Sequence, residues 1–263
     1  MALATLFFAA PAQALTPAPE AGACSLENAT PATVAGIDDD FDLLLDDGRR
    51  AALSGLEFPN APEQRAAARK RLSDWLAGRD VFIGALGAAP DRWGRTPARI
   101  FATQGSAADA PLVSVAAALL EEGRARFRPD PPAAGCAASY LAAEAPAREG
   151  HLGQWSDEAM RPVDAGAPDA AARLVHRKGM AIVFGVISST GESRAALYLN
   201  FGEKRAENFS VVILRRNLAI FEQAGIVPRS LIGRQARVRG LIETSFGPRM
   251  QIASPAEIEI FDR

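Results

Sequence analysis

The sequence predicts an α+β protein, mainly β, made of two domains. Three observations lead to this fold class: strand patterns precede helix patterns in the first half, strand patterns dominate the last third, and a segment without periodicity separates the two. The length of 263 residues agrees with this division, because a domain usually takes roughly 100 to 200 residues. We expect the first domain at 30–156, a linker rich in Ala, Pro, Asp and Gly at 157–172, and the second domain at 173–263.

The first domain is expected to begin with a strand-rich region. The predicted strands are 33–37, 42–45, 51–53, 80–83 and 98–101. Asp46-Asp47-Gly48 predicts a hairpin turn between the second and third strands. An amphipathic helix at 63–76 ends before Gly78. Two further helices are predicted at 113–122, stopped by Gly123, and at 137–147.

The second domain is predicted to be a small OB-like β-barrel. Its expected strands are 181–187, 194–201, 209–214, 235–242, 249–252 and 258–261, with a short helix at 218–224. In the strand that begins at Gln235, alternation places Ala236 and Val238 on one face. Gln235, Arg237 and Arg239 lie on the other face, which is therefore basic.

The composition is that of an ordinary globular chain. Hydrophobic residues make up 48% and charged residues 23%, with 29 basic side chains against 31 acidic ones. These values exclude a disordered tail protein, a fibre and a polytopic membrane protein. Residues 1–172 hold about 15 basic and 23 acidic side chains and residues 173–263 about 14 and 8. The second domain is thus the basic one.

Residues 1–14 are similar to a secretory signal. An apolar run at 2–10 is too short to span a bilayer, and Ala12-Gln13-Ala14 fits the small-x-small cleavage rule. Because no basic segment precedes the run, an ordinary N-terminus is the alternative. Export predicts a periplasmic or secreted protein without a transmembrane segment after cleavage. It also predicts a disulfide between Cys24 and Cys136, against the alternative of two unpaired, buried thiols.

The basic face of the second domain predicts binding of single-stranded nucleic acid or another polyanion. Arg237 and Arg239 supply positive charge, and Tyr198, Phe201 and Phe209 supply aromatic surfaces on which bases stack. Two structural interpretations stay open. In the first, the arginines only form the polar face that a barrel strand needs, and the aromatic residues fill the core. In the second, the acidic first domain docks against the basic second domain.

Five motifs in the first domain resemble those of the staphylococcal nuclease, or thermonuclease-like, family. In order along the chain they are GIDDD at 36–40, LSGLEFPN at 53–60, DRWGR at 91–95, LLEEGRA at 119–125 and EAPAR at 144–148. They span residues 33–155. The resemblance implies an OB barrel with helices packed beside it, which agrees with the strand and helix order above.

The resemblance implies a degenerate active site. The family's reaction needs a calcium site, two arginines that hold phosphate and a glutamate that activates water. Asp40 and Glu57 fall on the calcium ligands and Arg95 on one arginine, whereas Ala52 and Asn60 replace the second arginine and the glutamate. Losing a positioned base costs about 10²–10⁴ in rate, and losing a charge-stabilising donor about 10²–10³.

The retained residues also have purely structural interpretations. Asp40 can belong to a solvated hairpin tip, Glu57 can pair locally, and Arg95 can form a structural salt bridge. Trp75 and Trp155 are expected in the core.

The leading hypothesis is an exported thermonuclease-like protein without efficient catalysis, acting as a binding or envelope-associated module with envelope proteins among its partners. The first alternative is a weak Ca²⁺-dependent nuclease or phosphodiesterase, with Arg50 substituting for the missing arginine. The second is nucleic-acid binding through the second domain alone. Calcium is the only cofactor that these hypotheses imply.

Overall fold

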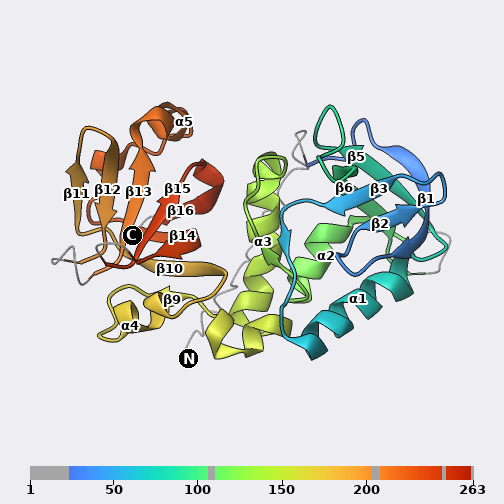
Figure 1. Cartoon of the computed structure of the whole chain (residues 1–263), viewed down its shortest axis with the longest axis horizontal. Coiled ribbons are helices and arrows are strands. Elements are labelled where there is room, and N and C mark those ends of the chain that lie inside the picture. Colours follow the sequence, from blue (N-terminus) through green and yellow to red (C-terminus); the bar gives the residue numbers. More distant parts are fainter. Residues whose placement is uncertain (1–23, 106–109, 203–207, 245–246, 262–263) are drawn as a thin grey trace, which may run out of the picture.

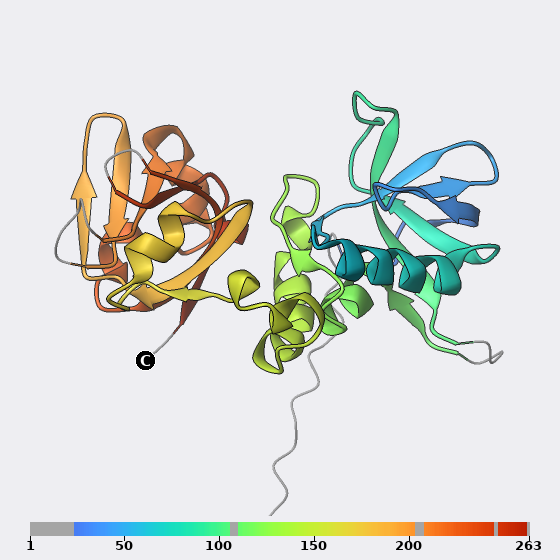
Figure 2. The same ribbon diagram turned by 60° about the horizontal axis from the view of Figure 1, so that its bottom comes forward.

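The computed structural model describes residues 24–105, 110–202, 208–244 and 247–261, so the predicted signal segment 1–14 lies outside the described residues. The described chain forms two hydrophobic cores, one on each side of helix α3 (Ala137–Glu149). Figures 1 and 2 both show α3 between the first-domain strands and the second-domain sheet.

Five strands of the first domain close into a mixed barrel consistent with an OB-like fold. Their order is β3-β2-β1-β5-β6, and a parallel pairing of β3 with β6 closes the barrel. The bounds are β1 (Thr30–Ile37), β2 (Leu43–Leu45), β3 (Arg50–Leu53), β5 (Asp80–Ala85) and β6 (Arg95–Thr103). An additional strand, β7 (Leu112–Ser114), pairs with the outer part of β6.

The predicted hairpin between the second and third strands is confirmed. Leu43 and Leu45 point into the core while Leu44 is exposed, as strand alternation requires. Gly48 has a φ of 84° in the turn, a conformation that glycine adopts without a steric penalty. Strands β2 and β3 then pair antiparallel.

Three helices lie beside the first-domain strands. They are α1 (Pro62–Leu76), α2 (Val115–Glu121) and α3. Helix α1 covers the barrel and buries Leu72, Trp75 and Leu76, so the expected core position of Trp75 is confirmed. The predicted helix 113–122 is shorter in the structure, because its first residues belong to β7 and the Ser114 hydroxyl accepts a hydrogen bond from the Ala117 amide. A short ribbon, β4 (Leu56–Glu57) with β8 (Arg126–Phe127), links the barrel to α3.

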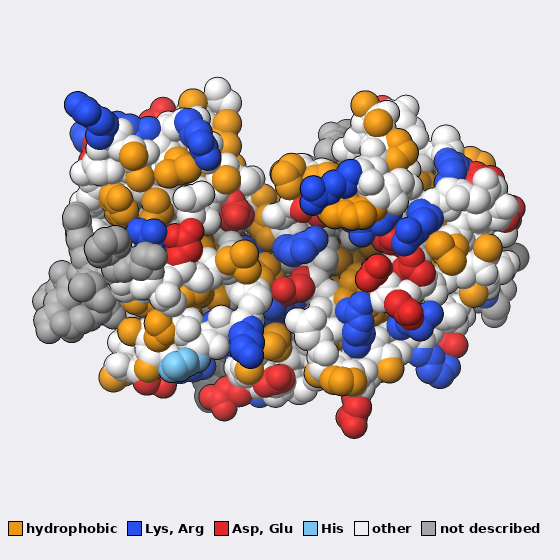
Figure 3. Space-filling view, viewed as in Figure 1, with side chains coloured by type: hydrophobic (Ala, Val, Ile, Leu, Met, Phe, Trp, Pro, Cys, Tyr) orange, Lys and Arg blue, Asp and Glu red, His pale blue; other side chains and the backbone are white. Residues whose placement is uncertain are grey.

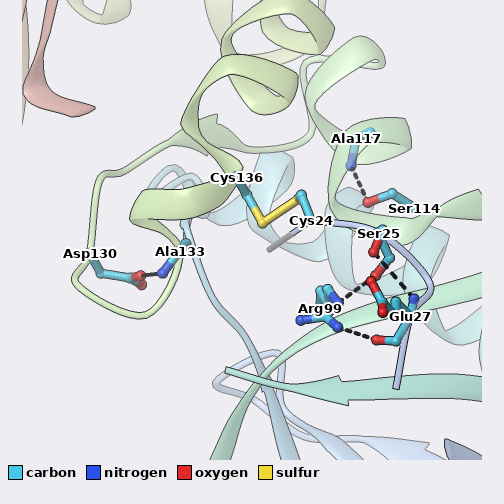
Figure 4. The surroundings of a disulfide bond; sticks show 9 residues. All are labelled: Cys24, Ser25, Glu27, Arg99, Ser114, Ala117, Asp130, Ala133 and Cys136. Atoms are coloured by element: carbon cyan, nitrogen blue, oxygen red, sulfur yellow. Dashed lines mark hydrogen bonds between the residues drawn. A yellow bond between two sulfur atoms is a disulfide. The ribbon is translucent and has the colours of Figure 1, made fainter. Parts of the chain in front are cut away.

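A disulfide joins Cys24 to Cys136, as predicted. Figure 4 shows the bond between the segment before β1 and the start of α3. Arg99 fastens the same segment by donating hydrogen bonds to the carbonyl oxygens of Ser25 and Glu27, at 2.6 and 2.5 Å. The bond is consistent with an extracytoplasmic location, since disulfides persist in oxidising compartments.

The described strands of the second domain form a mixed sheet of eight strands. The order is β11-β12-β13-β15-β14-β10-β9, with β16 paired to β14. The bounds are β9 (Val163–Asp164), β10 (Met180–Val186), β11 (Ser189–Glu192), β12 (Ala196–Asn200), β13 (Ser210–Leu214), β14 (Gln235–Glu243), β15 (Arg249–Ile252) and β16 (Ile258–Phe261). The helices are α4 (Ala170–Val175) and α5 (Leu218–Gln223).

This sheet is not closed, whereas the sequence predicts a second small barrel. One edge of β10 pairs with β14, and the other edge pairs with β9 in parallel. This second pairing is the reason why the sheet stays open. Strand β9 and the start of α4 come from the segment 157–172, which the sequence predicts as a linker. That segment therefore extends the second sheet and occupies the edge that barrel closure would need.

The two domains share a small apolar contact. Ala147 of α3, Trp155 after α3 and Ile182 of β10 pack together, and all three are fully buried. The expected core position of Trp155 is confirmed, although the core in question lies at the domain junction. Figure 3 shows the two lobes meeting there, with a notch at the upper side. Within the described residues, no helix is long and apolar enough to cross a membrane.

Candidate functional site

A cavity of about 310 Å³ opens on the first domain where the resemblance implies the active site. It lies between the β1–β2 loop, β3, the turn before β6 and the segment after β8. Its charged lining residues in the described chain are Asp40, Asp42, Asp91, Arg95, Arg128 and Asp130. The cavity is therefore lined by Asp40 and Arg95, the two residues retained from the motifs at 36–40 and 91–95, and by Ala52, one of the replaced positions.

The β1–β2 loop is shaped by Asp38 and Phe41. The Asp38 carboxylate accepts hydrogen bonds from the amides of Asp40 and Asp42, at 2.9 and 3.0 Å. Phe41 has a φ of 67° and stacks on Phe58 with ring centroids 3.7 Å apart. The loop is thus fixed on one wall of the cavity, with the aromatic pair beneath it.

Two arginines converge on Asp42. Arg50 donates a hydrogen bond from Nη2 to Asp42 Oδ2 at 2.9 Å and also pairs with Asp38. The Nη1 atom of Arg95 lies 3.9 Å from Asp42 Oδ1, and Arg95 Nε donates to Asp91 Oδ2 at 2.9 Å. Arg95 thus forms a salt bridge with Asp91, which is one of the two roles that the sequence allows for it. Both guanidinium groups face carboxylates of this chain.

Asp42 is a buried carboxyl whose pKa is shifted. Its side chain is 3% exposed, and burial raises the pKa of the carboxyl above its ordinary value. Arg95 and Arg50 act in the opposite direction, while Asp38 and Asp40 add to the rise. The folded structure therefore disfavours the negatively charged form of Asp42 relative to the unfolded chain.

The replaced catalytic positions supply no reactive group to this cavity. Ala52 lines it with a methyl group, and Asn60 is exposed and outside its lining. The Ala52 side chain has no donor for a phosphate, and the Asn60 amide cannot take a proton from water.

Glu57 lies in a different place from Asp40. Strand β4 pairs with β8 so that Glu57 is opposite Arg126, and the Glu57 carboxylate forms an ion pair with that guanidinium. Arg126 is 4% exposed and also donates to the carbonyl oxygens of Met160 and Met180, at 3.2 and 3.1 Å. Glu57 lines a second cavity at the domain junction. The two predicted calcium ligands thus line different cavities.

The described residues do not fit a calcium ion at this site. Calcium takes six to eight oxygen ligands from a cluster of carboxylates and carbonyls. Asp40 is exposed, Asp42 and Asp91 are engaged by arginines, and Glu57 is held by Arg126. Across the described ranges, no three His, Cys, Asp or Glu side chains group in a metal-binding arrangement.

The basic strand of the second domain faces the first domain at Arg239. This side chain is 1% exposed; its Nη1 donates to the Phe127 carbonyl at 2.8 Å, and its Nη2 to Glu144 Oε2 at 2.9 Å. Glu144 is fully buried and also accepts from the Phe127 amide at 2.7 Å and from Arg148 at 3.2 Å. Of the interpretations left open, docking of the first domain against this basic face is the one realised at Arg239.

The other residues predicted to bind nucleic acid do not share one open face. Arg237 pairs with Glu259 at 3.2 Å and lies over the Phe261 ring. Phe201 is 5% exposed and packs in the core against Phe209, with ring centroids 5.3 Å apart. Tyr198 is half-buried on β12. Their binding role remains a prediction, and the structure gives Arg239 and Phe201 structural contacts.

Sequence reasoning missed Asp42, Asp130, Arg126 and Glu144. Asp130 holds the cavity wall by accepting hydrogen bonds from the amides of Gly55 and Ala133, at 2.9 and 2.8 Å. One signal was available for Glu144, because it stands four residues before Arg148 on an otherwise alanine-rich helix.

No protein-family model matches the chain, and no curated protein matches it significantly. The first domain is therefore described by its architecture, a small mixed barrel with following helices.

Proposed function

We propose that this chain is an exported, non-catalytic binding module in which a degenerate thermonuclease-like domain and a second domain act as one unit. The observation that carries the proposal is the position of Glu57. Its carboxylate forms an ion pair with the buried Arg126 and lines the cavity at the domain junction, whereas Asp40 and Arg95 line the first-domain cavity. A residue that the reaction would need instead joins β4 to β8.

The charge of the first-domain cavity supports this proposal. Among the described residues that line it, four carboxylates stand against two guanidinium groups. Asp91 already neutralises Arg95, and Asp130 is held by backbone amides. A phosphodiester would meet net negative charge, whereas a basic side chain of a partner protein would be attracted.

A nuclease assay on the purified chain tests the proposal. Single-stranded DNA is incubated with the protein in the presence of Ca²⁺ and, separately, of a chelator. We expect equal, background cleavage in both, unchanged in Arg95→Ala. Calcium-dependent cleavage that disappears in Arg95→Ala would overturn the proposal.

One observation favours a second candidate, a weak phosphodiesterase. Arg50 lies opposite Arg95 in the β3–β6 pairing, and both side chains reach Asp42. Arg50 thus lies beside Arg95 and Asp42, as its substitution for the missing arginine would require. This candidate requires metal-dependent cleavage that is lost in Asp40→Asn as well as in Arg95→Ala.

A further inference from the structure

A third cavity, of about 490 Å³, lies where the chain enters the second domain. One wall is basic and comes from the end of α4 and the residues after it. The basic lining consists of Arg173, His176, Arg177 and Lys178. The opposite wall is apolar and includes Met160 and Val163, with Glu158 as the acidic side chain of the described lining.

Arg177 lies deepest among the basic groups. Its Nη2 donates a hydrogen bond to the Arg161 carbonyl at 2.7 Å, and its Nε is buried with no acceptor in the described structure. Burial lowers the pKa of Arg177, and the positive charges of Arg126 and Arg173 lower it further. Asp157 opposes this effect. The guanidinium therefore has a buried donor to spare in surroundings with excess positive charge.

Arg173 and Lys178 are exposed beside it. Within the described residues neither side chain forms an ion pair, whereas Arg50, Arg95, Arg126 and Arg239 all do. Three cationic side chains thus line one cavity with a single carboxylate among them. Unneutralised positive charge on one concave wall is a feature that binds a multivalent oxyanion.

We propose that this cavity binds a phosphate group, carried by a molecule whose apolar part lies against Met160 and Val163. Arg177 and Arg173 supply N–H donors, and Lys178 supplies a positive charge at the rim. The apolar wall favours amphiphilic phosphate esters, either soluble or as a lipid headgroup, over inorganic phosphates. This inference goes beyond the proposed function and does not depend on whether the first domain is catalytic.

Calorimetric titration of the full chain with inorganic pyrophosphate at low ionic strength tests the site. The variant is Arg173→Gln with Lys178→Gln, since both positions are exposed and Arg177 keeps its structural hydrogen bond. The control is Arg194→Gln with Arg216→Gln, which removes the same charge from exposed positions of the same domain. We expect at least about tenfold weaker binding in the variant, equal to about 1.4 kcal/mol, and unchanged binding in the control.

Two results would overturn the proposal: absence of pyrophosphate binding by the unmodified chain at millimolar concentration, or equal weakening in the variant and the control. Sedimentation with phosphatidylcholine vesicles containing phosphatidic acid then distinguishes the two sources. Vesicle binding that pyrophosphate displaces assigns a lipid headgroup, whereas pyrophosphate binding without vesicle binding assigns a soluble ester. Either result supports a phosphate site.

Discussion

Two arginine clusters of this molecule use the same residue types in opposite settings. Around Asp42, Arg50 and Arg95 lie beside a cavity, and their side chains are 37% and 29% exposed. At the domain junction, Arg126 and Arg239 are 4% and 1% exposed and reach carboxylates and carbonyl oxygens of other segments. Motif residues alone therefore do not identify a site, because burial decides whether a guanidinium is available to a ligand.

Replacement of Arg239 should give the largest effect. Arg239→Ala leaves Glu144 buried with only Arg148 as a charged partner, and breaking such a pair costs about 3–5 kcal/mol. We expect this loss in the free energy of unfolding measured by urea denaturation. The matched control is Arg249→Ala on β15, whose partly exposed pair with Glu243 contributes at most about 1 kcal/mol. Equal losses in both variants would contradict the special role of the junction.

Matching amide substitutions at Glu57 and Asp40 should change the free energy of unfolding by different amounts. Glu57→Gln removes the charge partner of the buried Arg126, so we expect a loss of about 1–3 kcal/mol. Asp40→Asn changes an exposed side chain and should stay within about 0.5 kcal/mol. Thermal unfolding with and without Ca²⁺ measures both. A calcium-induced rise in Tm that both substitutions abolish would instead make the two residues joint ligands.

Replacement of Asp42 should produce the smallest effect, a change in how the free energy of unfolding depends on pH. Its pKa in the folded state is raised, so its contribution to stability is fully present below the ordinary value of 3.8 and is lost as pH rises through the higher folded value. Relative to the unmodified chain, Asp42→Asn should therefore flatten the decline in stability above about pH 4. Urea denaturation over a pH series measures this.

Asp47 provides the opposite control for that series. The Arg49 backbone amide, followed by the Arg49 side chain, lowers the pKa of Asp47. Its contribution is therefore present above the ordinary value and lost as pH falls through the lower folded value. If Asp42→Asn and Asp47→Asn changed the slope in the same direction, the assignment of Asp42 would be wrong.

Local patterns were sufficient to predict the barrel strands, the hairpin at Gly48 and the Cys24–Cys136 bond. Each rests on alternation, turn chemistry or cysteine count within the chain. The partner of Glu57 could not be predicted, because the pairing of β4 with β8 joins segments 69 residues apart. The contact of Arg239 on β14 with Glu144 joins segments 95 residues apart, and the sequence left this partner open.

The open second sheet illustrates the same limit. Whether a sheet closes depends on which strand reaches its free edge, and here that strand is β9, only two residues long. Val163 and Asp164 lie in a segment rich in Pro, Ala, Asp and Gly, which carries no strand periodicity. Their conformation is set by the neighbouring β10, so a reading of the segment by itself predicts a linker.

The disulfide also determines how mechanical tension passes along the chain. A pull on the two ends of the described chain travels from Cys24 directly to Cys136, across a sequence separation of 112 residues. Strands β1 to β8 and helices α1 and α2 all lie within this bypassed loop. The barrel is therefore shielded from stretching while the disulfide is intact, and the force acts on α3, the segment after it and the second domain.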